Sequence, residues 1–400
     1  MFPYRHLGAS WDAMISRMVG LRLACCLSLI VSIGCGRFDF DRVNDGDAGT
    51  NGDASNAPDG GDAPGDGPVT DSPYNLVFVT STSTRLAEVG GLAGADAMCN
   101  QLAADAGLRG TYVAWLSDAS TSAASRLSGA RGWVRYDGKP VVDTVADLLA
   151  GRILHPILLT ETGVAVTGQF GIITATSNDG TLAEDCSGFT STSSSVTMMT
   201  GIAGATFSTW TQNLASNCSQ SLPLYCFGVD RSVPLTYTPA TGRRAFVSAA
   251  SWAPSGGVTA ADAACQAAAD ARALGGSWRA LIATTTATAA SRFSASGAPW
   301  VRLDGIALAS TPDVLLDGEI LDAPLNYTET GQYRGSNPAN TGATSTTALG
   351  TAASTCLDWT SSAMADSQRV GLLNSITLYF STPIFQTCSS GGGQLYCLEP

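Results

Sequence analysis

The sequence contains few of the side chains on which metal binding and acid–base catalysis usually depend. Among its 400 residues there are two histidines, His6 and His155, and a single lysine, Lys139. A zinc site needs three or four nitrogen, sulfur or oxygen ligands, and a serine hydrolase needs a histidine base. With so little histidine we expect neither, and we expect His155 to be a surface or loop residue.

Charged residues are also scarce, at 14% of the chain, and the formal net charge is −12. Nucleic-acid binding needs clusters of Lys and Arg that displace counterions from phosphates. Binding to anionic lipid headgroups needs similar clusters. We therefore expect no nucleic-acid partner and no membrane contact through basic side chains.

What the sequence does contain is a frame of four cysteines that occurs twice. The first set is Cys99, Cys186, Cys218 and Cys226, and the second is Cys265, Cys356, Cys388 and Cys397. Successive cysteines are 87, 32 and 8 residues apart in the first set and 91, 32 and 9 apart in the second. An even number of cysteines in each set is typical of disulfides when the protein is exported, and an export signal is described below. We predict two tandem modules, residues 75–230 and 245–400, joined by a linker over 231–244. Spacing alone leaves three possible pairings in each module.

Residues 1–35 have the features of a secretion signal. The apolar run over residues 23–33 is too short to cross a bilayer but suits the core of a signal peptide. It leads into a Ser-Ile-Gly-Cys sequence that is similar to a bacterial lipobox. We expect Cys35 to be lipidated and the protein to be exported and anchored in the outer membrane at the cell surface. An ordinary cleaved signal is the alternative, and residues 1–13 are interpreted as lying upstream of the true start.

Residues 36–74 are predicted to form a disordered stalk. Between residues 41 and 73 there are eight Asp, seven Gly and no aromatic residue, so this segment cannot bury enough apolar surface to fold. The alternative is a calcium-binding Asp repeat. An EF-hand loop needs a Glu at its twelfth position, and the segment has no Glu. We therefore favour a flexible tether.

Each predicted module opens with the pattern of a strand followed by a helix. β-Branched and aromatic residues predict short strands over 76–80 and 245–248. Ala-rich segments after paired glycines then predict a helix that carries the first cysteine of each set. Asp96 and Asp262 fall near the expected start of these helices, where the helix dipole favours acids. We interpret them as first-turn acids and not as catalytic residues.

Further segments match between the two predicted modules, in a pattern that indicates several short antiparallel strands. The matches are 133–138 with 300–305, 160–163 with 328–331, and 224–226 with 395–397. The first pair alternates and ends in Asp-Gly, which is typical of a strand that enters a hairpin turn. The second pair is Thr-Glu-Thr-Gly, and the third is Leu-Tyr-Cys. Together these segments indicate an α+β fold with one or two helices per module.

The order of these motifs resembles the endostatin-like branch of the C-type-lectin-like fold. More narrowly, the chain is similar to bacterial endostatin-like outer-membrane lipoproteins, whose domain has no assigned function. The resemblance covers both modules, about three quarters of the chain. It implies nested disulfides, which are Cys99 with Cys226, Cys186 with Cys218, Cys265 with Cys397, and Cys356 with Cys388.

Two matched pairs of ionisable residues are candidates for a further site. Arg135 with Glu161, and Arg302 with Glu329, are interpreted as ion pairs that either hold the sheet together or form part of a ligand cleft. We favour the structural role. The carboxylate-bearing triplets with which C-type lectins bind calcium and sugar are absent from the sequence, so we expect no calcium-dependent site and no cofactor.

We therefore expect a non-enzymatic binding or adhesion protein whose partner is an extracellular protein or glycan and whose membrane contact is the lipid anchor alone. The long polar segments 185–205 and 331–355 are the expected ligand-contacting loops. One alternative is a calcium-independent carbohydrate-binding module for envelope or exopolysaccharide glycans, with exposed Trp or Tyr along a groove. A weaker alternative is an envelope hydrolase, which needs two convergent carboxylates, such as Glu161 and Asp137, with shifted pKa values.

Overall fold

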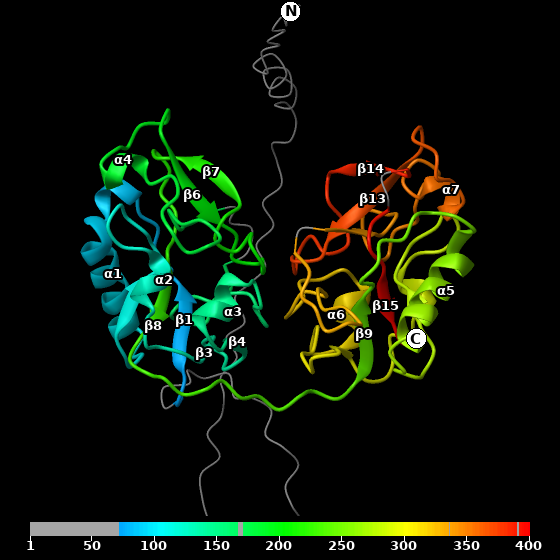
Figure 1. The fold of residues 1–400 in the computed structure, drawn as a ribbon, viewed down its shortest axis with the longest axis horizontal. Helices are drawn as coiled ribbons and strands as arrows, with labels where there is room; N and C mark the ends of the chain where they lie inside the picture. Colours follow the sequence, from blue (N-terminus) through cyan, green and yellow to red (C-terminus); the bar gives the residue numbers. More distant parts are fainter. Residues whose placement is uncertain (1–71, 167–170, 336, 390–391) are drawn as a thin grey trace, which may run out of the picture. The chain divides into compact units, whose positions relative to one another are not determined.

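The computed structural model describes residues 72–166, 171–335, 337–389 and 392–400. The expected signal, the lipidation site Cys35 and nearly all of the expected stalk lie outside these residues. The described residues form a mixed α+β structure with small sheets, few helices and four disulfides (Figure 1). Below, residues 72–230 are called the first half and residues 243–400 the second half. None of the described helices has the length and apolar character needed to cross a membrane.

The main sheet of the first half has five short strands in the order β2-β8-β1-β3-β4. Its strands are β1 (Asn75–Val79), β2 (Tyr112–Ala114), β3 (Trp133–Val134), β4 (Pro140–Val142) and β8 (Tyr225–Gly228). β1 and β3 are parallel, and the other neighbours are antiparallel. Every residue of β1 is buried, so the opening strand predicted from the sequence lies inside the sheet and is its central strand.

The second half builds a sheet with the corresponding order, β10-β15-β9-β11. Its strands are β9 (Arg243–Val247), β10 (Arg279–Ala280), β11 (Trp300–Arg302) and β15 (Tyr396–Leu398). β9 and β11 are again parallel, while β15 pairs antiparallel with both of its neighbours. Each half thus places its opening strand between the strand that begins with the Tyr-Cys of the Leu-Tyr-Cys motif and the strand that begins with Trp.

Each half also has a three-stranded antiparallel sheet. These sheets contain β5 (Ile172–Ile173), β6 (Thr197–Gly201) and β7 (Leu214–Asn217) in the first half, and β12 (Pro338–Asn340), β13 (Ser367–Leu372) and β14 (Phe385–Thr387) in the second. Strand β6 lies within segment 185–205, and β12 lies within segment 331–355. The two segments expected to be long loops are therefore partly strands. Buried residues such as Met198 and Ala339 draw these parts into the core.

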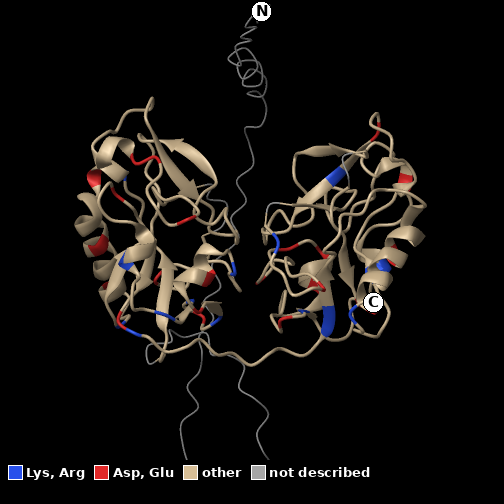
Figure 2. Cartoon of the chain, in the orientation of Figure 1, with Lys and Arg blue, Asp and Glu red and all other residues tan. Residues whose placement is uncertain are grey.

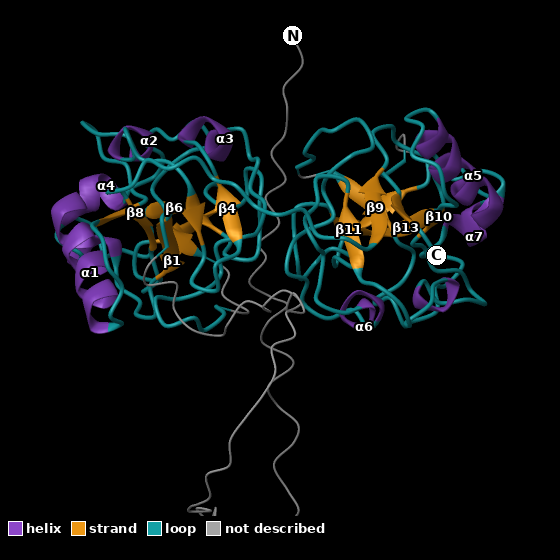
Figure 3. Ribbon diagram, turned by 90° about the horizontal axis from the view of Figure 1, so that it is seen from below, coloured by secondary structure: helices purple, strands orange, loops and turns teal. Residues whose placement is uncertain are grey.

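Two long helices, α1 (Gly91–Asp105) and α5 (Gly257–Asp270), cover one side of each main sheet (Figure 3). Each buries a stripe of small residues four apart, which are Ala95, Cys99 and Ala103 in α1, and Ala261, Cys265 and Ala269 in α5. Short helical turns complete the fold, namely η2 (Leu86–Glu88), α2 (Ala123–Arg126), α3 (Val145–Leu149), α4 (Cys186–Phe189), η3 (Ala290–Arg292), α6 (Pro312–Leu316) and α7 (Cys356–Trp359).

The disulfides have the nested pairing that the resemblance implies. They join Cys99 to Cys226, Cys186 to Cys218, Cys265 to Cys397, and Cys356 to Cys388. The first and third bonds fasten the long helix of each half to its Leu-Tyr-Cys strand. The second and fourth close loops with the same sequence separation of 32 residues. Each half is therefore closed by its own two disulfides.

Candidate functional site

The structure corrects the expected ion pairs, because each arginine binds an aspartate two residues further along the chain. Arg135 Nε lies 3.1 Å from an oxygen of Asp137, and Arg302 Nε lies 3.0 Å from an oxygen of Asp304. Both aspartates stand in the hairpin turn that follows the strand, so the turn folds each carboxylate back onto the guanidinium. Glu161 and Glu329, the partners expected from the sequence, instead accept backbone amides of Ser81 and Ala249.

The Arg302–Asp304 pair is closed to solvent. Its side chains are 0% and 8% exposed, whereas Asp137 in the first half is 32% exposed. Tyr333 donates a hydrogen bond of 2.8 Å to Asp304, and Arg302 donates to Pro324 O at 3.0 Å. Burial acts to raise the pKa of Asp304, but the charge and hydrogen bonds of Arg302 outweigh it and hold that pKa below its usual range. This pair is buried and internally bonded, and its two residues also form part of the lining of an open pocket of about 430 Å³ beside residues 239–242.

Glu161 and Glu329 instead fasten the Thr-Glu-Thr-Gly turn to the end of the opening strand. The backbone amide of Ser81 donates to Glu161 at 3.0 Å, and the Ser81 hydroxyl donates to the other carboxylate oxygen. In the second half the amide of Ala249 donates to Glu329 at 2.8 Å. Glu161 is 3% exposed, and both of its oxygens are thus occupied by Ser81.

These contacts bear on the hydrolase alternative, which named Glu161 and Asp137. A general acid needs a raised pKa. Burial acts to raise the pKa of Asp137, but the hydrogen bond and charge of Arg135 prevail and hold that pKa below its usual range. Asp137 therefore lacks the raised pKa of a general acid. Glu161 is bound on both oxygens.

His155 lies in a loop, as expected, but it is buried and not at the surface. Its Nδ1 is 2.7 Å from the carbonyl oxygen of Pro140. Burial, together with the positive charge of Arg135, lowers its pKa to about 3. His155 is therefore a neutral side chain of the interior at physiological pH and has no position from which to act as a base on a ligand.

Asp96 and Asp262 do not cap their helices, which begin five residues earlier, at Gly91 and Gly257. Asp96 accepts the amide of Ala114 at 2.9 Å and pairs with Arg126, and Asp262 accepts the amide of Ala280 at 2.9 Å and pairs with Arg292. Both bonds join the long helix to the strand after it. The sequence carried a signal for this, since Asp and Arg are 30 residues apart in both halves.

Two further kinds of site considered from the sequence, a metal site and an exposed aromatic groove, can be compared with the structure. Within the described residues, no group of three His, Cys, Asp or Glu side chains is arranged to hold a metal ion. Most tryptophans are core residues, and Trp115, Trp133, Trp210, Trp300 and Trp359 are nearly inaccessible. Their burial leaves them unavailable for the exposed aromatic groove that a stacking type of carbohydrate-binding module would use.

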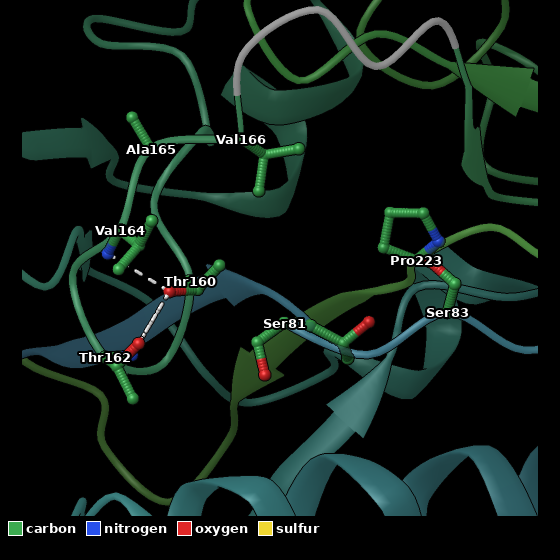
Figure 4. Close-up of a pocket in the computed structure, with 9 residues that line it drawn as sticks. Ser81, Ser83, Thr160, Thr162, Val164, Ala165, Val166 and Pro223 are labelled. Carbon is green, nitrogen blue, oxygen red and sulfur yellow. Dashed lines mark hydrogen bonds between the residues drawn. The ribbon is translucent and has the colours of Figure 1, made fainter. Parts of the chain in front are cut away.

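The first half contains a small open pocket at the end of β1 (Figure 4). It has a volume of about 310 Å³, at the lower end of the roughly 300–1,000 Å³ usual for ligand sites. Its lining residues are Thr80, Ser81, Ser83, Thr160, Thr162, Val164, Ala165, Val166 and Pro223. Five of these residues carry hydroxyl groups, four are apolar and none is charged. Charged side chains are sparse over the ribbon as a whole (Figure 2).

Long-range pairing brings the walls of this pocket together. Val79, the last residue of β1, forms a parallel bridge with Thr160, and the Leu224 amide donates to the Thr80 hydroxyl at 2.9 Å. The Thr160 and Thr162 hydroxyls are 3.0 Å apart and hydrogen-bonded (Figure 4). Ser83 is exposed and makes no hydrogen bond with the other described residues. Sequence patterns missed this site because its residues come from three distant segments.

Comparison with known proteins does not assign a family. No protein-family model matches the sequence, and no curated protein matches it. The fold and the pocket together define an α+β protein that is closed by disulfides and has an uncharged, hydroxyl-lined pocket in its first half.

Proposed function

We propose that this protein is an exported, lipid-anchored, non-enzymatic binding protein of the outer membrane. Two tandem endostatin-like modules with the C-type-lectin-like fold would present surfaces to an extracellular protein or matrix ligand. One observation carries the proposal: the ionisable residues that recur in both halves bind other parts of the protein. The matched Asp, Glu and Arg side chains of both halves form internal bonds, which suits a scaffold and leaves binding to the exposed segments.

Two exposed segments, one after the second cysteine of each half, differ in character. Residues 187–195 are mostly Ser and Thr, whereas residues 357–365 include the exposed apolar side chains of Leu357 and Met364. Equivalent positions on one scaffold thus carry different surfaces, which supports separate contacts for the two halves. Two contacts on one tether would increase the apparent affinity for a large ligand.

The binding proposal is tested with the full-length, disulfide-intact protein in solid-phase assays against matrix proteins and glycans. We expect saturable binding to at least one of them, and weaker binding when residues 187–195 or 357–365 are replaced by Gly-Ser sequences. Absence of binding to every matrix protein and every glycan would count against the proposal.

The anchor is tested separately in cells by Cys35→Ala. We expect the native protein in the detergent-extractable membrane fraction and the variant in the soluble exported fraction. An unchanged distribution would argue for an ordinary signal or no lipid.

Calcium-independent carbohydrate binding is the second candidate function, and the hydroxyl-lined pocket favours it. Binding of this kind would survive a chelator such as EDTA and would be competed by a free sugar. Binding to a protein ligand would be insensitive to the sugar.

A further inference from the structure

The second half has a position equivalent to the pocket, defined by matching backbone contacts. Val247 bridges Thr328 in parallel, as Val79 bridges Thr160. The Leu395 amide donates to the Ser248 hydroxyl at 2.9 Å, as the Leu224 amide does to Thr80 at the same distance. The residues that line the pocket of the first half can therefore be matched one by one with residues of the second half.

In the second half this position is filled by an arginine. The amide of Val166 donates to Leu158 O at 2.8 Å, and the amide of Arg334 makes the matching bond to Asn326 O at 2.7 Å. Arg334 thus stands where Val166 lines the pocket. Its guanidinium reaches the carbonyl oxygen of Ala249 at 2.9 Å.

Ala249 is the counterpart of Ser81, because each gives its amide to the matched glutamate. Val166 and Ser81 lie on different walls of the open pocket (Figure 4). The Arg334 side chain therefore spans, in the second half, the space that is open in the first. Gln394 replaces Pro223 there, and within the part of the chain that the structure describes its buried Oε1 has no hydrogen-bond partner, nor does the Nε of Arg334.

The charges around the open pocket restrict what it can hold. The lining carries no charge, and the neighbouring carboxylate of Glu161 is occupied on both oxygens by Ser81. An anion would find no cation there, and a cation would find no free carboxylate, so either would lose hydration without compensation. Hydroxyl groups of a ligand, which both donate and accept, can pair with the Ser83 hydroxyl and with the acceptor positions left on Ser81 and Thr162, whose hydroxyls each make one hydrogen bond.

The apolar residues and the volume restrict the ligand further. Val164, Ala165, Val166 and Pro223 provide a surface for C–H groups next to the hydroxyl-bearing residues. A volume of about 310 Å³ suits a single ring-sized group and not a long chain. A compact ring with hydroxyls at its edge and C–H groups on its face meets all of these conditions.

We propose that the pocket of the first half binds one uncharged, hydroxyl-bearing ring, as in a neutral sugar, and that Arg334 closes the equivalent position of the second half. The chain then has one such site and not two. This inference rests on the proposed binding function and names the ligand class for one of its surfaces.

The test uses the full-length, disulfide-intact protein and a panel of free neutral monosaccharides, free uronic acids and immobilised glycans with neutral or acidic termini. We expect a neutral sugar to bind with a stoichiometry of one and the acidic sugars to bind at least ten times more weakly. Binding of the free sugar as well as the glycan locates recognition in the ring. Binding of the glycan alone would show that recognition needs more than the pocket, and would overturn the one-ring site.

Four variants locate the site. Val166→Arg copies the second half and should weaken binding at least tenfold, and Thr162→Val, which removes one hydroxyl at nearly constant volume, should weaken it about fivefold. Leu214→Arg makes the same kind of change at an exposed position outside the pocket and should leave binding intact. Arg334→Val should not reduce binding. Circular dichroism and non-reducing electrophoresis check that each variant is folded.

The outcomes separate this inference from the binding function. Undiminished sugar binding by both Val166→Arg and Thr162→Val would overturn the pocket assignment, as would a stoichiometry of two in the native chain. Binding to matrix protein that persists in these variants would leave the proposed function standing while the sugar site fails. Failure of the whole panel and of the matrix proteins would remove both.

Discussion

At the scale of the residue, the buried His155 couples folding to pH. Its pKa is about 3 in the folded protein and about 6.5 in an unfolded chain. As the pH falls below 6.5 the unfolded chain therefore takes up a proton that the folded protein does not. Stability is complete above that pH and is lost as the pH falls toward 3.

We expect the free energy of unfolding to drop by about 2 kcal/mol between pH 7 and pH 5 because of His155. Urea denaturation at several pH values measures this. In His155→Gln, which keeps a donor for the Pro140 carbonyl but does not titrate, the drop should nearly vanish. The same slope in the variant and the native protein would show that His155 is not the cause. This range lies above the ordinary pKa of Asp and Glu, so carboxylates contribute little to the slope.

The two Arg–Asp pairs provide a second prediction for single residues, because they have the same geometry and different burial. Removing one partner of a buried pair leaves an uncompensated charge and costs about 3 kcal/mol or more. Asp304→Asn should therefore destabilise the protein by about that amount, since Asp304 is 8% exposed and Arg302 is fully buried. Asp137→Asn is the matched control and should cost clearly less, since Asp137 is 32% exposed. Equal losses in urea denaturation would contradict the role assigned to burial.

At the scale of the element, α4 and α7 are single left-handed turns. All four residues of each have positive φ, from 59° to 70° in α4 and from 48° to 67° in α7. Non-glycine residues in this conformation cost roughly 1–2 kcal/mol each. The surrounding structure compensates, since Thr285 donates two hydrogen bonds to Asp358 and the Trp359 indole donates to Ala283 O at 2.8 Å.

Leu357 is the residue at which this strain can be measured. It has a φ of 52° and is 48% exposed, so Leu357→Gly removes strain while losing little packing. We expect a gain in stability of about 1 kcal/mol, seen as a higher melting temperature. Leu349→Gly is the control, because Leu349 is similarly exposed but is not among the residues with positive φ. It should lose stability through the added freedom of the unfolded chain. A loss in both variants would contradict a strained turn.

The elements also show what sequence patterns can and cannot predict. The opening strands and the Asp-Gly turns are fixed by local alternation and turn residues, and the opening strands were predicted within two residues. The turns α4 and α7 could not be predicted, because Leu357 and its neighbours have no intrinsic preference for positive φ. The partners of Arg135 and Glu161 also escaped prediction. Several acidic residues could have paired with Arg135, and several donors could have bound Glu161. Which of them does so depends on how the hairpin and the opening strand are placed in three dimensions.

At the scale of the whole molecule, the duplicated sequence is accompanied by a duplicated set of bonds. Corresponding strands have the same order, and the corresponding Asp–Arg pairs join each long helix to the short helical turn, α2 or η3, that follows the next strand. The exceptions lie at the ligand-accessible positions, where Val166 is matched by Arg334 and a Ser/Thr segment by one with Leu357 and Met364. Bonds that hold each half together are therefore retained, while the surfaces have diverged, as expected if the halves share a scaffold and differ in what they bind.

The predicted division into two modules can be tested by cutting the linker. Residues 231–242 contain no helix or strand, and most of residues 232–242 are exposed. Because every disulfide joins cysteines on the same side of this segment, one cut there leaves no covalent link between the halves. We expect brief proteolysis of the native protein to give two fragments that separate on a denaturing gel without reductant. Mass spectrometry should find two intact disulfides in each fragment.

Fragments that separate only after reduction would place a disulfide across the linker. Rapid digestion of one fragment would show that this half depends on the rest of the chain to stay folded.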